Sequence, residues 1–102
     1  MNYGEYFDTN PPPYVDCSNL SEVSNLSFRL CKKIQHIKNL GTNSSYYDVL
    51  STNMFDGCEI LEDLSNCYLS LKGSCGNYIF RNCYLLNDFI NCQFNLDECV
   101  SF

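Results

Sequence analysis

Apolar residues recur along the first half of this chain with a spacing that predicts a helix. Between residues 19 and 40 an apolar side chain returns after every three or four positions, as expected for one face of an α-helix. The members of this stripe are Val23, Leu26, Leu30, Ile34 and Ile37. Asn19 and Glu22 have the spacing of a capping box, and Gly41 stands where a helix C-cap commonly falls. The pattern therefore predicts a first helix over residues 19–40.

Two shorter helices are predicted next, over residues 46–55 and 58–72. Both segments carry apolar residues at helical spacing, and both are followed by a glycine that favours a helix end, Gly57 and Gly73. Acidic residues stand early in the second segment, where they complement the positive end of a helix dipole.

The segment over residues 77–92 also has a helical stripe, but it is rich in residues that favour strands. We predict a helix there. The fold class that follows is mainly α: a small disulfide-rich helical domain of about four short helices. The alternative is an α+β fold with strands in 77–100.

We find no repeat of 20–50 residues, the period expected of repeat architectures. Six of the eight cysteines fall at near-regular spacing between Cys58 and Cys99, which leaves a short-period solenoid as an alternative. Glycine is scarce in this stretch and the intervening residues do not repeat in kind, so we favour the helical domain.

A chain of 102 residues is expected to form one domain. Residues 1–16 are predicted to be an extended N-terminal arm, because Pro11, Pro12 and Pro13 favour a polyproline-like conformation and several aromatic residues surround them. Residues 17–102 are predicted to be the single disulfide-stapled domain. The arm is either a loose leader or a segment that docks on a partner.

Eight cysteines in so short a chain approach the density of a disulfide scaffold, which is typical of an oxidising compartment. We predict that most or all of them are paired, in an order that the sequence does not determine. Metal ligation and reduced, buried cysteines that act as small hydrophobes are the alternatives. The predicted disulfide cysteines are Cys17, Cys31, Cys58, Cys67, Cys75, Cys83, Cys92 and Cys99.

Cys58 and Cys67 are nine residues apart, as are Cys83 and Cys92. Nine residues correspond to about 2.5 turns of a helix, and an odd offset on a strand also changes face. Each pair is therefore expected to point to opposite sides of its segment. We expect each segment to be bridged to two different neighbours.

The net charge is −6, with six basic residues against twelve acidic ones. Nucleic acid and anionic membranes both require a basic surface, so we expect neither as a partner. No run of 18 apolar residues is present, so no membrane insertion is expected. The first residues do not form a signal peptide, and we interpret Met1 as the start of a chain whose leader is absent.

The predicted location is extracellular, with the mitochondrial intermembrane space as the alternative. Both follow from the expected disulfides. Three Asn-x-Ser sequons would be glycosylated on a secretory route, at Asn19, Asn25 and Asn43.

No arrangement of residues in the sequence predicts catalysis or cofactor binding. Zinc sites usually contain a Cys-x2-Cys pair and redox catalysis needs Cys-x-x-Cys, whereas no two cysteines here are closer than seven residues. His36, the only histidine, is expected to be a solvated surface residue. The carboxylate pairs Glu62-Asp63 and Asp97-Glu98 are expected to diverge. We therefore predict no enzyme activity, no catalytic residue, no metal site and no cofactor.

Aromatic residues make up 15% of the chain, with eight tyrosines and seven phenylalanines. So small a core is not expected to bury them all. They either pack with their hydroxyls at the surface or form a patch for a protein partner, where tyrosine is enriched. The predicted partner-binding residues are Tyr14, Tyr68, Tyr78, Phe80 and Tyr84.

These observations predict a small secreted cysteine-rich binding protein, similar to a ligand or effector, that acts through protein–protein contacts. The alternative is a non-catalytic structural subunit of a larger assembly in an oxidising compartment.

Overall fold

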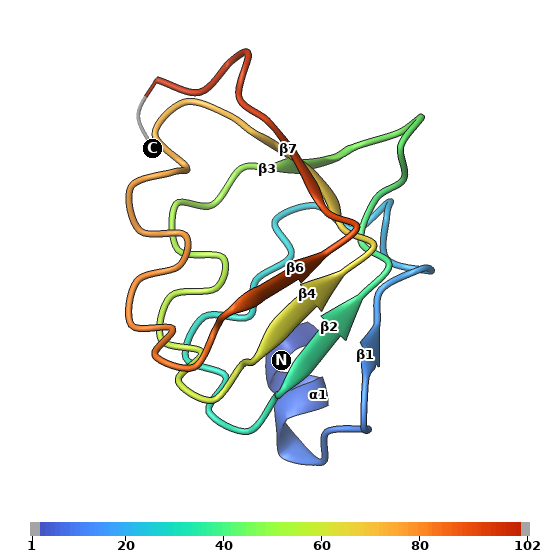
Figure 1. Ribbon diagram of the computed structural model, residues 1–102, viewed down its shortest axis with the longest axis vertical. Coiled ribbons are helices and arrows are strands. Elements are labelled where there is room, and N and C mark those ends of the chain that lie inside the picture. The colour runs from blue at the N-terminus through green and yellow to red at the C-terminus, as the bar shows by residue number, and fades with distance from the viewer. Residues whose placement is uncertain (1–2, 101–102) are drawn as a thin grey trace.

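The computed structural model describes residues 3–100 and shows a chain wound into a parallel β-solenoid (Figure 1). Each turn of the chain after the first strand, which we call a coil, places one short strand in each of two sheets. The first sheet has the order β1-β2-β4-β6 and the second the order β3-β5-β7, and all neighbours are parallel. The elements are α1 (Tyr3–Thr9), β1 (Val15–Asp16), β2 (His36–Lys38), β3 (Tyr47–Val49), β4 (Asp63–Ser65), β5 (Tyr68–Leu71), β6 (Asp88–Ile90) and β7 (Gln93–Asn95).

The coils share a thirteen-residue sequence repeat. It reads Phe-x2-Cys-x2-(Ile/Leu)-x2-(Ile/Leu/Phe)-x-Asn-(Leu/Cys), and it begins at Phe28, Phe55 and Phe80. The periods are therefore 27 and 25 residues. Strand register follows the repeat, because Ile37 pairs with Leu64 and Leu64 pairs with Phe89. We refer to the coils that contain β2 and β3, β4 and β5, and β6 and β7 as the first, second and third.

Equivalent apolar side chains stack on one another along the solenoid axis and form the core. Phe28 and Phe55 stack with their ring centroids 5.7 Å apart, and Phe55 and Phe80 follow at 5.5 Å. Every coil contributes side chains to this core, but those of the first two coils are buried most completely. Stacking of like coils thus buries a continuous apolar interior that no single coil could form.

Asparagine makes the turn between the two sheets in every coil. Asn39, Asn66 and Asn91 follow β2, β4 and β6 directly and have φ values of 65°, 52° and 54°. Asparagine tolerates this left-handed conformation better than other non-glycine residues. The amide of Asn66 also donates to the side-chain oxygen of Asn39 at 3.4 Å, which links the turns of the first and second coils.

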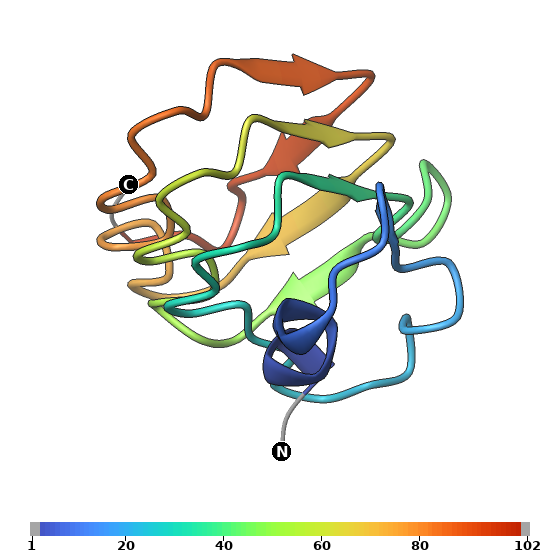
Figure 2. The same cartoon turned by 90° about the horizontal axis from the view of Figure 1, so that it is seen from below.

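The N-terminal end of the solenoid is covered by α1, which lies at the opposite end of the stack from β6 (Figure 2). A side chain at Gly4 would clash with the backbone of Ser27 and Phe28, so glycine permits close packing of the helix. The Asp8 carboxylate accepts the backbone N–H groups of residues 32, 33 and 34 at 3.2, 2.8 and 3.2 Å. The helix is therefore fastened to the first coil by packing and by hydrogen bonds.

The predicted mainly α fold is wrong. The segments 19–40, 46–55, 58–72 and 77–92 contain strands and turns, and the helix of the described chain, Tyr3–Thr9, lies in the segment predicted to be an extended arm. The α+β alternative is wrong as well, because strands begin at residue 15 and are not confined to 77–100. The prediction that the sequence contains no repeat of 20–50 residues is also wrong, because the fold is built on repeats with periods of 27 and 25 residues.

The predicted disulfides are wrong too. None of Cys17, Cys31, Cys58, Cys67, Cys75, Cys83, Cys92 and Cys99, all of which lie within residues 3–100, forms a disulfide. The predicted extracellular location and its intermembrane-space alternative are therefore wrong, because eight unbridged cysteines do not fit an oxidising compartment.

The coil repeat explains what the cysteines do instead. Cys31, Cys58 and Cys83 occupy one equivalent position in successive coils. The thiol of Cys58 donates to the carbonyl oxygen of Phe28, and that of Cys83 to the carbonyl oxygen of Phe55, each at 3.0 Å. Each thiol thus fills a small apolar position and bonds to the preceding coil.

The expectation that Cys58 and Cys67 point to opposite sides also fails. Both are fully buried in the same core, because the chain turns between them. Burial raises the pKa of the Cys67 thiol to about 12 and that of the Cys58 thiol further, so both are protonated at neutral pH.

Candidate functional site

Several side chains of the third coil lie at the surface, although the equivalent side chains of the second coil are buried. Leu64 and Leu71 are 0% exposed, whereas Phe89 and Leu96, at the equivalent positions one coil later, are 42% and 44% exposed. Phe80, Leu86 and Phe94 occupy further positions of this kind and are half-buried. We call these five residues, Phe80, Leu86, Phe89, Phe94 and Leu96, the terminal face.

The aromatic rings of the terminal face hold one another in place. Phe80 stacks on Phe55 below it and makes edge-to-face contacts with Phe89 and Phe94, with ring centroids 5.5 and 6.0 Å apart. Phe89 and Phe94 also meet edge to face, at 5.6 Å. Such mutual contacts restrict the rings to defined positions. The terminal face is therefore a pre-organised apolar surface.

Two strand edges flank this surface. β6 and β7 are the last strands of their sheets, so each has one edge without a partner strand in the described part of the chain. The other end of the first sheet is protected: β1 has two residues, prolines precede it, and α1 covers the first coil. Natural proteins use short strands, prolines and covering segments to prevent edge pairing. At the third coil, β6 is also short, at three residues, but all three are exposed and no proline stands beside them.

Fixed charges lie beside the terminal face. Arg29, Asp56 and Arg81 occupy equivalent positions in the three coils. Asp56 is only 2% exposed, and Arg81 donates to both of its oxygens at 3.2 and 2.7 Å, with the Arg29 guanidinium 4.0 Å away. The hydrogen bonds from Arg81 hold the pKa of the Asp56 carboxyl below its usual range. We call Arg29, Asp56 and Arg81 the charge column. Its hydrogen bonds between Arg81 and Asp56 link the third coil to the second.

The structure places three of the five predicted partner-binding residues on the third coil. Phe80 is part of the terminal face, while Tyr78, which lies against the Arg81 guanidinium, and Tyr84 are exposed on the flank of the same coil. Tyr14 lies beside β1, near the ring of His36, and Tyr68 lies in β5 against Tyr46. The predicted set is therefore divided, and its role in binding stays a prediction.

Sequence reasoning missed Phe89 and Leu96, the most exposed members of the terminal face. The third copy of the thirteen-residue repeat is the signal that could have identified Phe89. Its exposure also depends on its place at the end of the stack, which the local sequence does not encode.

His36 is half-buried rather than solvated. Its Nδ1 lies 2.8 Å from Oδ2 of Asp63, and its Nε2 lies 3.7 Å from Oε2 of Glu62, so this carboxylate pair converges on the ring. Over residues 3–100, no group of three histidine, cysteine, aspartate or glutamate side chains is arranged to hold a metal ion. The three predicted glycosylation sites, Asn19, Asn25 and Asn43, are exposed, and their modification stays a prediction.

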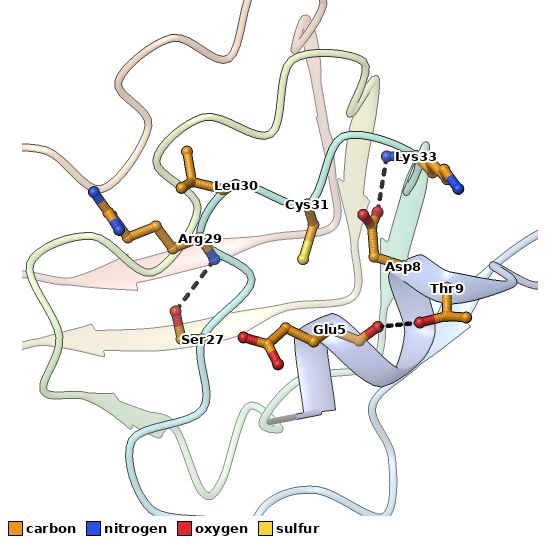
Figure 3. A pocket seen from close by; sticks show the side chains of 8 residues that line it. All are labelled: Glu5, Asp8, Thr9, Ser27, Arg29, Leu30, Cys31 and Lys33. Carbon is orange, nitrogen blue, oxygen red and sulfur yellow. Dashed lines mark hydrogen bonds between the residues drawn. The ribbon is translucent and has the colours of Figure 1, made fainter. Parts of the chain in front are cut away.

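A hollow of about 600 Å³ lies between α1 and the first coil (Figure 3). Glu5 and Asp8 from the helix lie opposite Cys31 and the backbone N–H of Lys33. Burial and these two carboxylates raise the pKa of the Cys31 thiol to about 12, so it is not an activated nucleophile. Asp8 already accepts the backbone N–H groups at the floor of the hollow. The hollow therefore serves the attachment of α1.

Comparisons with models of known protein families, with curated proteins and with solved structures find no match to this chain. No helix formed by residues 3–100 combines the length and the apolar character that crossing a membrane requires.

Proposed function

We propose that this protein is a binding module that engages a protein partner through the terminal face. The observation that carries the proposal is the difference between equivalent residues: Leu64 is fully buried and Phe89 is 42% exposed, although both belong to the inward row of their coils. A row that the fold buries everywhere else is thus presented at one end, next to two strand edges.

The chemistry of the surface supports protein binding. Interface centres are enriched in aromatic residues, and binding-energy hot spots lie in pre-organised apolar clusters. An unpaired strand edge adds main-chain hydrogen bonds to such a contact. The terminal face combines three phenylalanine rings with the free edges of β6 and β7.

A second candidate function is that of a structural subunit held permanently in a larger assembly. The composition of the terminal face favours it, because all five of its residues are apolar and permanent interfaces are more hydrophobic than transient ones. A permanent subunit is expected to aggregate when purified alone, whereas a binding module stays soluble.

Photo-crosslinking tests the proposal. A photoreactive amino acid replaces Leu96 on the terminal face in one variant and Leu50, which is 58% exposed on the loop after β3, in a matched control. We expect a discrete protein adduct from position 96 and none of the same mass from position 50. Equal labelling from both positions, or no adduct from position 96, would contradict the proposal.

A further inference from the structure

We infer that the partner at the terminal face is a second copy of this chain, docked end to end about a two-fold axis. The inference rests on the proposed function of that face and adds the identity of the partner.

The chemistry of the face specifies what can cover it. Inside the solenoid, each coil buries its inward row against a coil that presents a similar apolar row and a strand edge in each sheet. A surface that pairs with both strand edges and also buries the apolar row must therefore present phenylalanine or leucine side chains between two unpaired strand edges, which a covering helix such as α1 does not do. The terminal face of a second copy is such a surface, with Phe89 and Leu96 between β6 and β7.

The arrangement of the two ends limits this association to two copies. Head-to-tail stacking would require an open N-terminal end, but α1 covers the first coil and Asp8 fastens it there. Of the two ends of the stack formed by residues 3–100, the terminal face is therefore the one that combines an apolar row with the edges of β6 and β7. A contact between two terminal faces uses the same surface on both partners and closes at a dimer, whereas head-to-tail contacts would continue into fibres.

The two-fold axis sets the strand pairing. A half-turn rotation about this axis places β6 of one copy antiparallel to β6 of the other. Phe89 is the middle residue of this three-residue strand. With Phe89 opposite its own copy, each Asp88 lies opposite Ile90. Like charges directly opposite one another would oppose pairing. Asp88 is the only charged residue of β6, and β7 has none, so this register brings no two carboxylates together.

Sedimentation equilibrium of the purified chain tests the inference. We expect a mass of twice the 11.8 kDa chain, with dissociation on dilution. Each copy has a net charge of −6, so we also expect the dimer to be stronger at high ionic strength, where repulsion between the copies is screened. A chain that stays monomeric at every concentration would overturn the inference.

Two matched substitutions locate the contact. Leu96→Asp places a charge in the terminal face and should weaken the dimer by at least about 30-fold, the factor expected of a hot-spot residue. Leu50→Asp places the same charge on a residue at least as exposed but away from that face, and should leave the dimer unchanged. A dimer that survives Leu96→Asp, or that is lost in Leu50→Asp, would overturn the inference.

Two variants with opposite charges at position 89 distinguish a lost dimer contact from simple unfolding. Phe89→Lys and Phe89→Glu should each be monomeric, because the two-fold register places like charges opposite each other. A mixture of the two should form a mixed dimer, which misfolded chains could not do. Failure of the mixture to associate contradicts the predicted register.

The mass of the crosslinked adduct at position 96 tests the proposed function separately from the inference of a dimer. An adduct of twice the chain mass supports both proposals. An adduct of another mass with a monomeric chain overturns the second copy and retains the binding face. The absence of any adduct with a monomeric chain overturns both.

Discussion

Single residues in this protein are understood best by their place in the coil. Asn39, Asn66 and Asn91 recur because the turn between the sheets requires a positive φ. Leu30, Gly57 and Asn82 form a second set of equivalent positions with positive φ, although their side chains share no chemistry. The backbone conformation is thus kept in every coil, and asparagine or glycine reduces its strain in most of them.

Substitution of Asn66 tests this interpretation of the turns. Asn66→Ala and Asn66→Gly both lose the side-chain hydrogen bond to Asn39, but only alanine resists a φ of 52°. We expect the alanine variant to be less stable than the glycine variant by roughly 1 kcal/mol in urea denaturation. Equal stability of the two variants would show that this turn has no left-handed residue.

Substitution of Asp56 tests the charge column. Asp56→Asn removes the charge that Arg81 and Arg29 face, and we expect the free energy of unfolding to fall by roughly 2 kcal/mol at pH 7. The exposed Asp97→Asn is the control and should change it by less than about 0.5 kcal/mol.

The pH dependence of this loss has a defined sign. The pKa of Asp56 is lowered in the folded state from its ordinary value of 3.8, so the carboxylate contributes fully above that value. As the pH falls below 3.8 and through the lowered folded value, the contribution disappears. We therefore expect the difference in stability between the wild type and Asp56→Asn to narrow in acid. A difference that grows in acid would contradict this account.

At the scale of elements, the sequence allowed some positions to be predicted but not the structure that joins them. Leu26, Ile34 and Ile37, which the apolar stripe groups together, are all buried, but in the core of the solenoid and not on the face of a helix. Leu30 belongs to the same helical stripe but is exposed with a φ of 62°, which no helix residue has. Inward positions three residues apart around a coil imitate the spacing of a helix face, so local periodicity could not separate the two.

The sequence also singles out turn residues and cysteines, but the structural roles predicted for them are wrong. Gly41 and Gly73 were predicted to end helices, and they instead adopt φ values of 76° and 56° in turns of the solenoid. The cysteines were predicted to be cross-links because their number is even and their density high. Comparison of residues 27 or 25 positions apart places five of them in two stacked rows, with Cys31, Cys58 and Cys83 in one and Cys67 and Cys92 in the other.

Thiol chemistry tests the role of these rows. We expect eight thiols to react with Ellman's reagent after denaturation without a reductant, and few to react quickly in the native protein, where burial raises the pKa of Cys31 and Cys67 to about 12. A reductant should leave the melting temperature unchanged. Fewer than eight thiols, or a melting temperature that falls on reduction, would contradict the unbridged core.

At the scale of the whole molecule, the protein is a stack with two different ends. α1 covers the first coil, whereas the third coil presents Phe89 and Leu96 beside the edges of β6 and β7. Repeat proteins require terminal segments with a polar outer face, and only one end has a segment over it in the described chain. The sequence predicted that aromatic residues would form a contact surface, but the residues of that surface depend on where the stack stops.

Hydrogen–deuterium exchange of the unmodified chain at low and high protein concentration tests the terminal face most directly. We expect the amides of residues 88–95, which span β6 and β7, to exchange more slowly at high concentration, while those of α1 and β1 exchange at the same rate throughout. Exchange in β6 and β7 that does not depend on concentration, or new protection confined to α1, would contradict the account.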